Sequence, residues 1–259
     1  MPVQVWPLLL ANAITLNDDV FLFSPTSGTA TTFPNTISGV GGITKFGAGS
    51  VLLGGSNTFT GTTNIQFGPL TASGTHSLGA TSGITVDSGG TLVFGGATNN
   101  RINNTAPLSL DGMGSGTVSL QTAGLSEHGA TNNTAGIGAL TLLSNSIIDL
   151  ANGASVIAFA NSSGQTWTGT LSVYNWSGNP IYGNGNDQVY FGNGITGLNP
   201  AQLAEIRFYS DAGTTFLGIG SWGIDLDGEV VPLPEPATWI GGALALGAIG
   251  FTRRRRRRS

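Results

Sequence analysis

The sequence predicts an all-β fold, and two observations carry this prediction. Short runs such as residues 91–94, 108–110 and 140–142 alternate apolar and polar side chains, and Gly, Asn or Ser separates them. A period of two that is bounded by turn-forming residues is typical of half-buried strands. Between residues 43 and 176 no stretch has a convincing period of 3.6 residues, so no helix is expected there. Further strands are expected at residues 50–53, 117–120, 147–150, 156–159 and 171–174.

Two all-β architectures fit this pattern, a β-sandwich and a right-handed parallel β-helix. Glycine-rich corners and the scarcity of Asn-Gly or Asp-Gly turns between neighbouring runs favour the β-helix. Its coils would stack about 4.8 Å apart. Leu, Val, Ile and Phe would then form a continuous core, with Thr and Ser on the outside. We therefore predict a right-handed parallel β-helix over residues 39–176.

Residues 42–61 resemble the autotransporter-associated β-strand repeat. The resemblance rests on Lys45, the Gly-Ala-Gly that follows it, the apolar pair Leu52-Leu53, then Asn57, Phe59 and Thr-Gly, and it continues to Ile65. Passenger domains that carry this repeat are right-handed β-helices, so the resemblance implies the same architecture here. Unlike those proteins, this chain has no run of alternating segments after the repeat that would build a membrane barrel.

The regions on either side of the predicted β-helix have a different character. Residues 1–38 are interpreted as an N-terminal strand or cap region. They lack the basic start of a secretory signal, and we expect a missing upstream segment, or else a first strand at residues 3–11. Residues 177–231 are interpreted as a β-rich cap containing one short helix at about 199–208. Asn199 would cap this helix, with Pro200 at its first position and Leu203 and Ile206 pointing inward.

Residues 232–259 form a segment with three parts. Pro234, Glu235 and Pro236 come first, an uncharged apolar run over 237–252 follows, and six arginines close the segment. Sixteen helical residues span about 24 Å, slightly less than a bilayer core of roughly 30 Å. We expect one C-terminal transmembrane helix with the arginines on the cytoplasmic side. The anchor residues would be Trp239, Ile240, Leu244, Leu246, Ile249 and Phe251, and the charge stop Arg253, Arg254, Arg255, Arg256, Arg257 and Arg258.

This order of parts resembles the PEP-CTERM sorting signal of Gram-negative bacteria. The resemblance implies recognition of Pro234, Glu235 and Pro236 by an exosortase, a membrane enzyme that removes the tail. The protein would be held transiently in the inner membrane and then pass to the cell surface or the extracellular matrix. The expected role is that of a structural or adhesin-like protein, with exopolysaccharide as a possible partner. The alternative is a secreted carbohydrate-binding or polysaccharide-active β-helix protein.

The charge distribution bears on possible partners. Before residue 232 the basic residues are Lys45, Arg101 and Arg207, against 12 of the 13 acidic residues of the chain. Such an acidic body cannot neutralise phosphates, so no nucleic-acid partner is expected. Charged residues make up only 8% of the chain, against about 25% in ordinary domains. The chain has no cysteine, which excludes disulfides and thiol chemistry.

No catalytic residue, metal or cofactor is expected, and the protein is not predicted to be an enzyme. Ser126, Glu127 and His128 are consecutive and are interpreted as a solvated turn, because triad members must converge in space. His76 is interpreted as a loop residue. The acidic residues Asp225, Asp227 and Glu229 could at most bind Ca²⁺ weakly. A group of aromatic residues could stack on sugars, although plugging the end of the β-helix is the favoured interpretation: Trp167, Tyr174, Trp176, Tyr182 and Tyr190.

Overall fold

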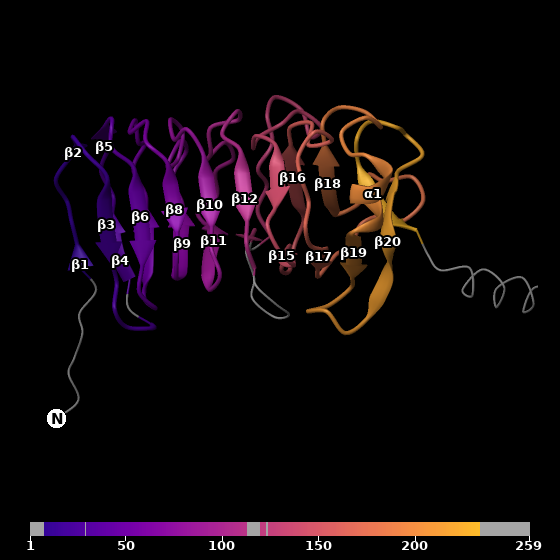
Figure 1. Ribbon diagram of the computed structural model, residues 1–259, viewed down its shortest axis with the longest axis horizontal. Coiled ribbons are helices and arrows are strands. Elements are labelled where there is room, and N and C mark those ends of the chain that lie inside the picture. The colour runs from indigo at the N-terminus through magenta and orange to yellow at the C-terminus, as the bar shows by residue number, and fades with distance from the viewer. Residues whose placement is uncertain (1–7, 29, 113–119, 123, 234–259) are drawn as a thin grey trace, which may run out of the picture.

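The computed structural model describes residues 8–28, 30–112, 120–122 and 124–233. Strands are the main regular secondary structure of these residues, and most of them pair in parallel sheets, as the alternating sequence pattern predicts. The strands follow one another along the long axis of the molecule in chain order, from the N-terminal to the C-terminal end (Figure 1).

The largest sheet has eleven strands. Its order is β1 (Leu8–Leu9), β4 (Ala30–Phe33), β7 (Ser50–Leu53), β9 (Gly68–Ala72), β11 (Gly90–Phe94), β13 (Leu120–Gln121), β15 (Ser146–Asp149), β17 (Leu171–Tyr174), β19 (Ile206–Tyr209), β20 (Phe216–Trp222) and β21 (Val230–Leu233). The pairings from β1 to β19 are parallel, whereas β19–β20 and β20–β21 are antiparallel.

A second sheet has six strands, all parallel. Its order is β14 (Leu140–Leu142), β12 (Leu108–Leu110), β10 (Ile84–Val86), β8 (Thr63–Ile65), β6 (Ile43–Phe46) and β3 (Val20–Phe23). From β6 to β15 the chain alternates between this sheet and the eleven-stranded sheet. We call one strand of each sheet with its connections a rung, so that β6–β7, β8–β9 and β10–β11 are successive rungs.

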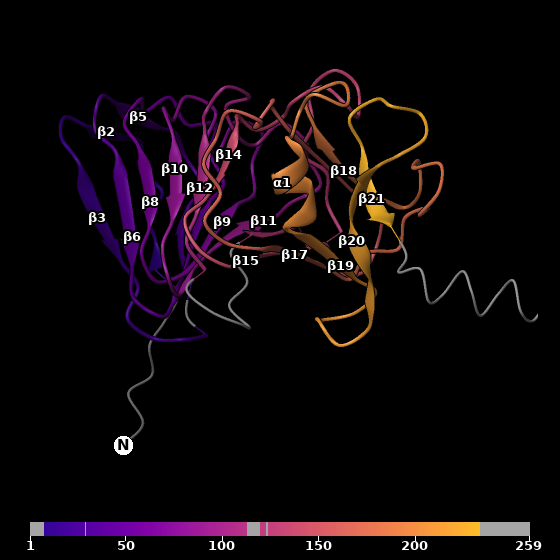
Figure 2. The same cartoon turned by 45° about the vertical axis from the view of Figure 1, so that its right-hand side comes forward.

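Two small parallel sheets lie on a third side of the rungs. They pair β2 (Ile14–Leu16) with β5 (Ile37–Gly39), and β16 (Ser155–Phe159) with β18 (Asp187–Phe191). Single bridges such as Leu78–Ile102 and Glu127–Ile157 continue the pairing between them. In Figure 2 the strands β2, β5 and β18 of this third side lie in the upper part, above β9, β11, β15 and β17 of the eleven-stranded sheet.

Alternation within the strands builds the core between the sheets. In β11 the side chains of Leu92 and Phe94 point inward and Gly90 is buried, whereas Thr91 and Val93 are partly exposed. Register then places buried apolar residues above one another from rung to rung, in the series Leu70, Leu92, Leu120, Ile148, Val173 and Phe208. One continuous apolar core therefore runs through the stack.

Glycine is required where neighbouring rungs meet at a corner. A Cβ atom on Gly61 would lie 2.3 Å from the backbone nitrogen of Gly42, and a Cβ on Gly42 would lie 2.4 Å from the carbonyl oxygen of Thr62. Both contacts are with backbone atoms, which cannot move aside as a flexible side chain can. These are the glycines that begin and end the repeat-like segment, so close approach of backbones explains that part of the motif.

The helix is shorter than predicted. Helix α1 spans Pro200–Ala204, with Asn199 as its cap and Glu205 at its end. The prediction of helix to residue 208 was wrong, because Ile206–Tyr209 is strand β19 and Ile206 pairs with Leu171 of β17. Ile206 is buried as expected, and Leu203 is half-buried.

The sheets also extend beyond the predicted limits of the β-helix at residues 39 and 176. Strands β1 to β5 pair with one another or with the next rung, so residues 8–39 share the same sheets. At the other end β17 pairs in parallel with β19. Pro232 lies inside β21, so this strand crosses the predicted boundary between cap and tail.

None of the described residues forms a helix with the length and apolarity that a membrane span needs. The predicted transmembrane helix lies outside the described residues.

Candidate functional site

The predicted sorting residues fall outside the part of the chain that the structure describes. Strand β21 ends at Leu233, and Pro234, Glu235 and Pro236 follow it directly in the sequence. The predicted anchor and the six arginines also lie beyond this point. The other candidate sites lie within the described residues 8–233.

A buried ion pair joins two rungs on the third side of the stack. The side chains of Arg101 and Glu127 are both fully buried, and Nη1 of Arg101 lies 3.1 Å from Oε2 of Glu127. The expectation that Glu127 belongs to a solvated turn was wrong. A bridge between Glu127 and Ile157 and the core beneath it hold the segment against the next rung.

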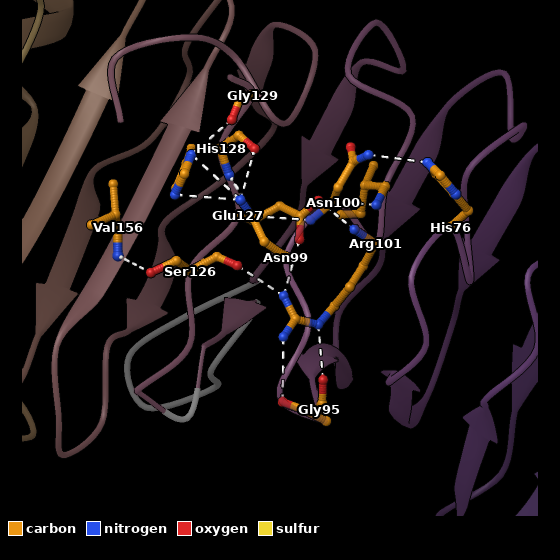
Figure 3. Close-up of polar contacts among 12 residues, drawn as sticks. His76, Gly95, Asn99, Asn100, Arg101, Ser126, Glu127, His128, Gly129 and Val156 are labelled. Atoms are coloured by element: carbon orange, nitrogen blue, oxygen red, sulfur yellow. Dashed lines mark hydrogen bonds and ion pairs between the residues drawn. The ribbon is translucent and has the colours of Figure 1, made fainter. Parts of the chain in front are cut away.

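The pair is held by further hydrogen bonds (Figure 3). Oε1 of Glu127 accepts the backbone N–H groups of Arg101 and Ile102, at 2.7 and 3.0 Å. The Arg101 guanidinium also donates to the carbonyl oxygens of Gly95, Gly96 and Ser126 and lies 5.4 Å from the centre of the Phe94 ring. Burial raises the pKa of Glu127 to about 7, although the N–H donors and the guanidinium act in the opposite direction. Each group is thus engaged by the other and by the backbone.

The neighbouring histidines and serine do not converge on Glu127. The N–H of Val156 donates to Oγ of Ser126, and Asn99 contacts both ring nitrogens of His128 at 3.3–3.4 Å. His76 contacts Asn100 at 3.0 Å. Ser126, Glu127 and His128 therefore point to different partners, and the arrangement has no nucleophile–base pair of the kind that acyl transfer needs.

Lys45, an inward-facing residue of β6, also connects neighbouring rungs. Its side chain is fully buried, and Nζ donates to the carbonyl oxygens of Gly47 and Phe67, at 2.6 and 2.7 Å. Burial lowers the pKa of Lys45 to about 8. The amine thus bridges two successive rungs. The sequence signal for this role was the lysine of the repeat-like motif.

Asn57 is a second residue of that motif that ties rungs together. It is buried, its Oδ1 accepts the N–H of Ile37 at 2.7 Å, and its Nδ2 donates to the carbonyl of Ser77 at 2.7 Å. Each bond joins residues 20 positions apart, so one amide connects three successive rungs.

The acidic segment near the C-terminal end of the body does not form a metal cluster. Glu229 is buried, and its Oε2 accepts the N–H of Asn184 at 2.7 Å, whereas Oε1 is buried without a partner. Burial raises the pKa of Glu229 to about 7, and Asp227 and Asp225 contribute to the rise. Within the described residues, no group of three His, Cys, Asp or Glu side chains could hold a metal ion.

The aromatic residues that the sequence singled out are separated in the structure. Trp176 and Tyr190 are buried, and Trp176 packs edge-on against Phe208. Tyr174 packs against Tyr209, on the outer face of the eleven-stranded sheet, while Tyr182 is exposed in a loop. They do not form one platform for sugar stacking.

Trp167 lines a small cavity beside α1. The cavity has a volume of about 180 Å³ and is lined by Gln165, Trp167, Asn199, Ala201, Gln202 and Glu205. The segment before β17 supplies Gln165 and Trp167, and α1 with its two caps supplies the others. The contact between these two segments could not be predicted from local sequence patterns, because the segments are more than 30 residues apart.

Comparison with protein-family models, with curated proteins and with solved structures gives no match.

Proposed function

We propose that the chain is an exported structural or adhesin-like protein of the cell surface or extracellular matrix of a Gram-negative bacterium. The observation that carries the proposal is the order of the C-terminal parts: Pro234-Glu235-Pro236, an uncharged run, and a block of six arginines. Basic clusters next to an apolar segment stay on the cytoplasmic side, so this order directs the rest of the chain out of the cell.

The body is proposed to be a right-handed parallel β-helix. Parallel pairing and the alternation of the chain between two large sheets support this architecture. The right hand follows from the strong preference of parallel crossover connections, about 98% of which are right-handed. Such a body is rigid without disulfides, because each rung pairs with the rung before and after it.

A structural role agrees with how the body uses its few charges. Lys45 and Arg101 are buried and engaged in bonds between rungs, which leaves Arg207 as the partly exposed basic side chain of the described residues. The acidic surface disfavours a nucleic-acid partner. It is compatible with an uncharged partner such as a neutral exopolysaccharide.

An exosortase-type enzyme is the proposed processing partner. The last strand of the body ends at Leu233, directly before the motif. The apolar run over 237–252 would hold the chain in the inner membrane, and Arg253 and the arginines after it would stop translocation. Cleavage near residues 234–238 would then release the body from this transient anchor.

Mass spectrometry of the surface-extracted protein tests this proposal. The full chain is expressed in a Gram-negative host that has its own exosortase, and in the same strain without that enzyme. The mature form should end near residues 234–238 and lack peptides from the arginine block in the first strain only. Glu235→Ala should reduce processing, whereas Asp87→Asn, which removes a carboxylate between β10 and β11, should not. Intact arginine peptides from the surface form of the first strain would show that the tail is only an anchor.

A carbohydrate-binding or polysaccharide-active protein is the second candidate function. The cavity at Trp167 favours the binding form of this alternative. Turnover of a polysaccharide by the purified full chain would favour an enzyme over a scaffold or adhesin.

A further inference from the structure

We propose that the cavity beside α1 binds one sugar ring of a neutral polysaccharide. The inference rests on the adhesin-like role proposed above and assigns its ligand class and its contact residues. The cavity measures about 180 Å³, smaller than the roughly 300–1,000 Å³ of sites for drug-sized ligands. It therefore suits a single ring of a longer chain that continues along the surface.

The walls of the cavity are held in place before any ligand binds. Nε1 of Trp167 donates to the carbonyl oxygen of Leu140 at 2.9 Å, and the Trp167 and Phe191 ring centroids are 5.9 Å apart. Gln202 is buried, and its Nε2 donates to the carbonyl oxygens of Ser162 and Gln165, both at 2.9 Å. A preformed wall lowers the entropy that binding costs.

Asn199 completes this rigid frame. Its Oδ1 accepts the N–H of Gln202 at 3.0 Å, while Oε1 of Gln202 accepts the N–H of Asn199 at 2.9 Å. Nδ2 of Asn199 donates to the carbonyl of Ser163 at 3.2 Å. Asn199 and Gln202 are thus engaged with each other and with the backbone, and they shape the cavity.

Two polar groups in the lining are open to solvent and make no hydrogen bond to other described residues. They are the carboxylate of Glu205, which stands at the end of α1, and Nε2 of Gln165, whose Oε1 already accepts a bond from Thr141. A carboxylate accepts hydrogen bonds, and an amide nitrogen donates them. Sugar hydroxyls do both, so a ring in the cavity can form hydrogen bonds with these lining groups.

Trp167 provides the apolar contact. It is partly exposed, and it shares the cavity with Glu205 and Gln165. The face of an aromatic ring carries partial negative charge, which attracts the weakly positive C–H groups on one face of a pyranose. A combination of one aromatic wall and a few placed polar groups is typical of small-molecule sites.

The charges select neutral sugars over acidic ones. The lining holds the Glu205 carboxylate and no basic side chain. Two of the three basic residues of the body, Lys45 and Arg101, are fully buried elsewhere. A uronic acid in the cavity would place its carboxylate next to Glu205 without a cation to compensate, and like charges at short distance repel.

Isothermal titration calorimetry with the full 259-residue chain tests the proposal. The full chain includes the predicted membrane segment, so the measurement is made in detergent. A polyoxyethylene detergent is used because it carries no sugar headgroup that could compete for the site. The neutral probes are hexasaccharides of β-1,4-, β-1,3- and α-1,4-linked glucose, and the acidic probe is hexagalacturonate. At least one neutral probe should bind, and hexagalacturonate should bind about ten-fold more weakly or not at all.

Variants identify the site and its charge selection. Glu205→Ala should weaken binding of the neutral probe about ten-fold or more, the usual effect of losing hydrogen bonds to a charged group. Glu205→Gln should reduce the difference in affinity between the neutral and acidic probes. A purely structural role for Glu205 would not produce this change. Trp167→Ala should abolish binding and Trp167→Phe retain part of it, with thermal unfolding measured for both. Asp87→Asn is the matched control and should bind as the parent chain does.

Failure to bind any neutral probe would overturn the proposal, and so would affinity that Trp167→Ala and Glu205→Ala leave unchanged in folded protein. Neither result affects the C-terminal processing measured by mass spectrometry. The proposed sugar site can therefore be refuted while the proposed surface location stands, and the reverse is also true.

Discussion

Individual polar side chains replace backbone pairing where the third side of the stack lacks regular strands. Glu127 accepts the N–H groups of Arg101 and Ile102, and Asn57 bonds to Ile37 on one rung and Ser77 on another. A buried N–H or C=O group without a partner costs about 1–3 kcal/mol. The side chains of Glu127 and Asn57 avoid that cost, because each of them bonds to backbone groups of other rungs.

Glu229 should make stability depend on pH. Its pKa is raised from 4.5 to about 7 by burial, with Asp227 and Asp225 contributing. The folded state therefore holds this proton more tightly than the unfolded state, and the stabilisation is complete below about pH 4.5. It is lost as the pH rises through about 7. Glu229→Gln cannot ionise, so at pH 8 it should be more stable than the parent chain by about 1–3 kcal/mol.

Urea unfolding between pH 4 and 8 measures this effect. Glu127 also has a raised pKa, so the variant should keep part of the pH dependence. Asp211→Asn, at an exposed loop, provides a comparison at another carboxylate. An unchanged pH profile in Glu229→Gln would show that this carboxyl titrates normally in the folded protein.

At the scale of elements, alternation identified the strands well, and four predicted runs coincide with β7, β12, β14 and β17. The alternation works because successive side chains of a strand point to opposite faces, so the pattern of burial is written in adjacent residues. The helix was less predictable. Asn199 and Pro200 signal its start, but its end is set by pairing of Ile206 with Leu171 in a distant strand.

Substitutions of two neighbours in β11 should have very different effects. Leu92 is fully buried in register with Leu70 and Leu120, whereas Val93 is partly exposed. Leu92→Ala should lower the free energy of unfolding by about 2–5 kcal/mol, because it leaves a cavity in the core. Val93→Ala should cost less than about 1 kcal/mol. Denaturant titrations measure the free energy of unfolding of both variants. Equal decreases in the two variants would contradict the assigned register.

At the scale of the whole molecule, stability should be distributed rung by rung. Each strand from β6 to β12 pairs with strands of the preceding and following rungs. Stability in such a stack is approximately a sum of rung and nearest-neighbour contributions. A defect in one rung should therefore lower the stability of the neighbouring rungs most and that of distant rungs least.

Glu127→Ala tests whether stability is distributed rung by rung. It leaves the Arg101 guanidinium buried without its carboxylate, which costs about 3–5 kcal/mol. Hydrogen exchange should speed up most at Arg101, Ile102 and the adjoining strands β12 and β16, and least in β6 and β8. Asp87→Asn should leave the exchange pattern unchanged. Uniform loss of protection along the stack would mean that the body unfolds as a single unit.

The β class, the strongly alternating strands and the three parts of the tail can be recognised from the sequence alone, because neighbouring residues carry these properties. Which polar residues are buried depends on contacts between distant parts of the chain. Glu127 meets Arg101 across 26 positions, and Trp167 meets α1 through the stacking of rungs. No local pattern encodes such partners, since they depend on which rung lies above which. The repeat-like motif indicated some of the bonds between rungs. Its residues Lys45 and Asn57 are themselves the side chains that join one rung to the next.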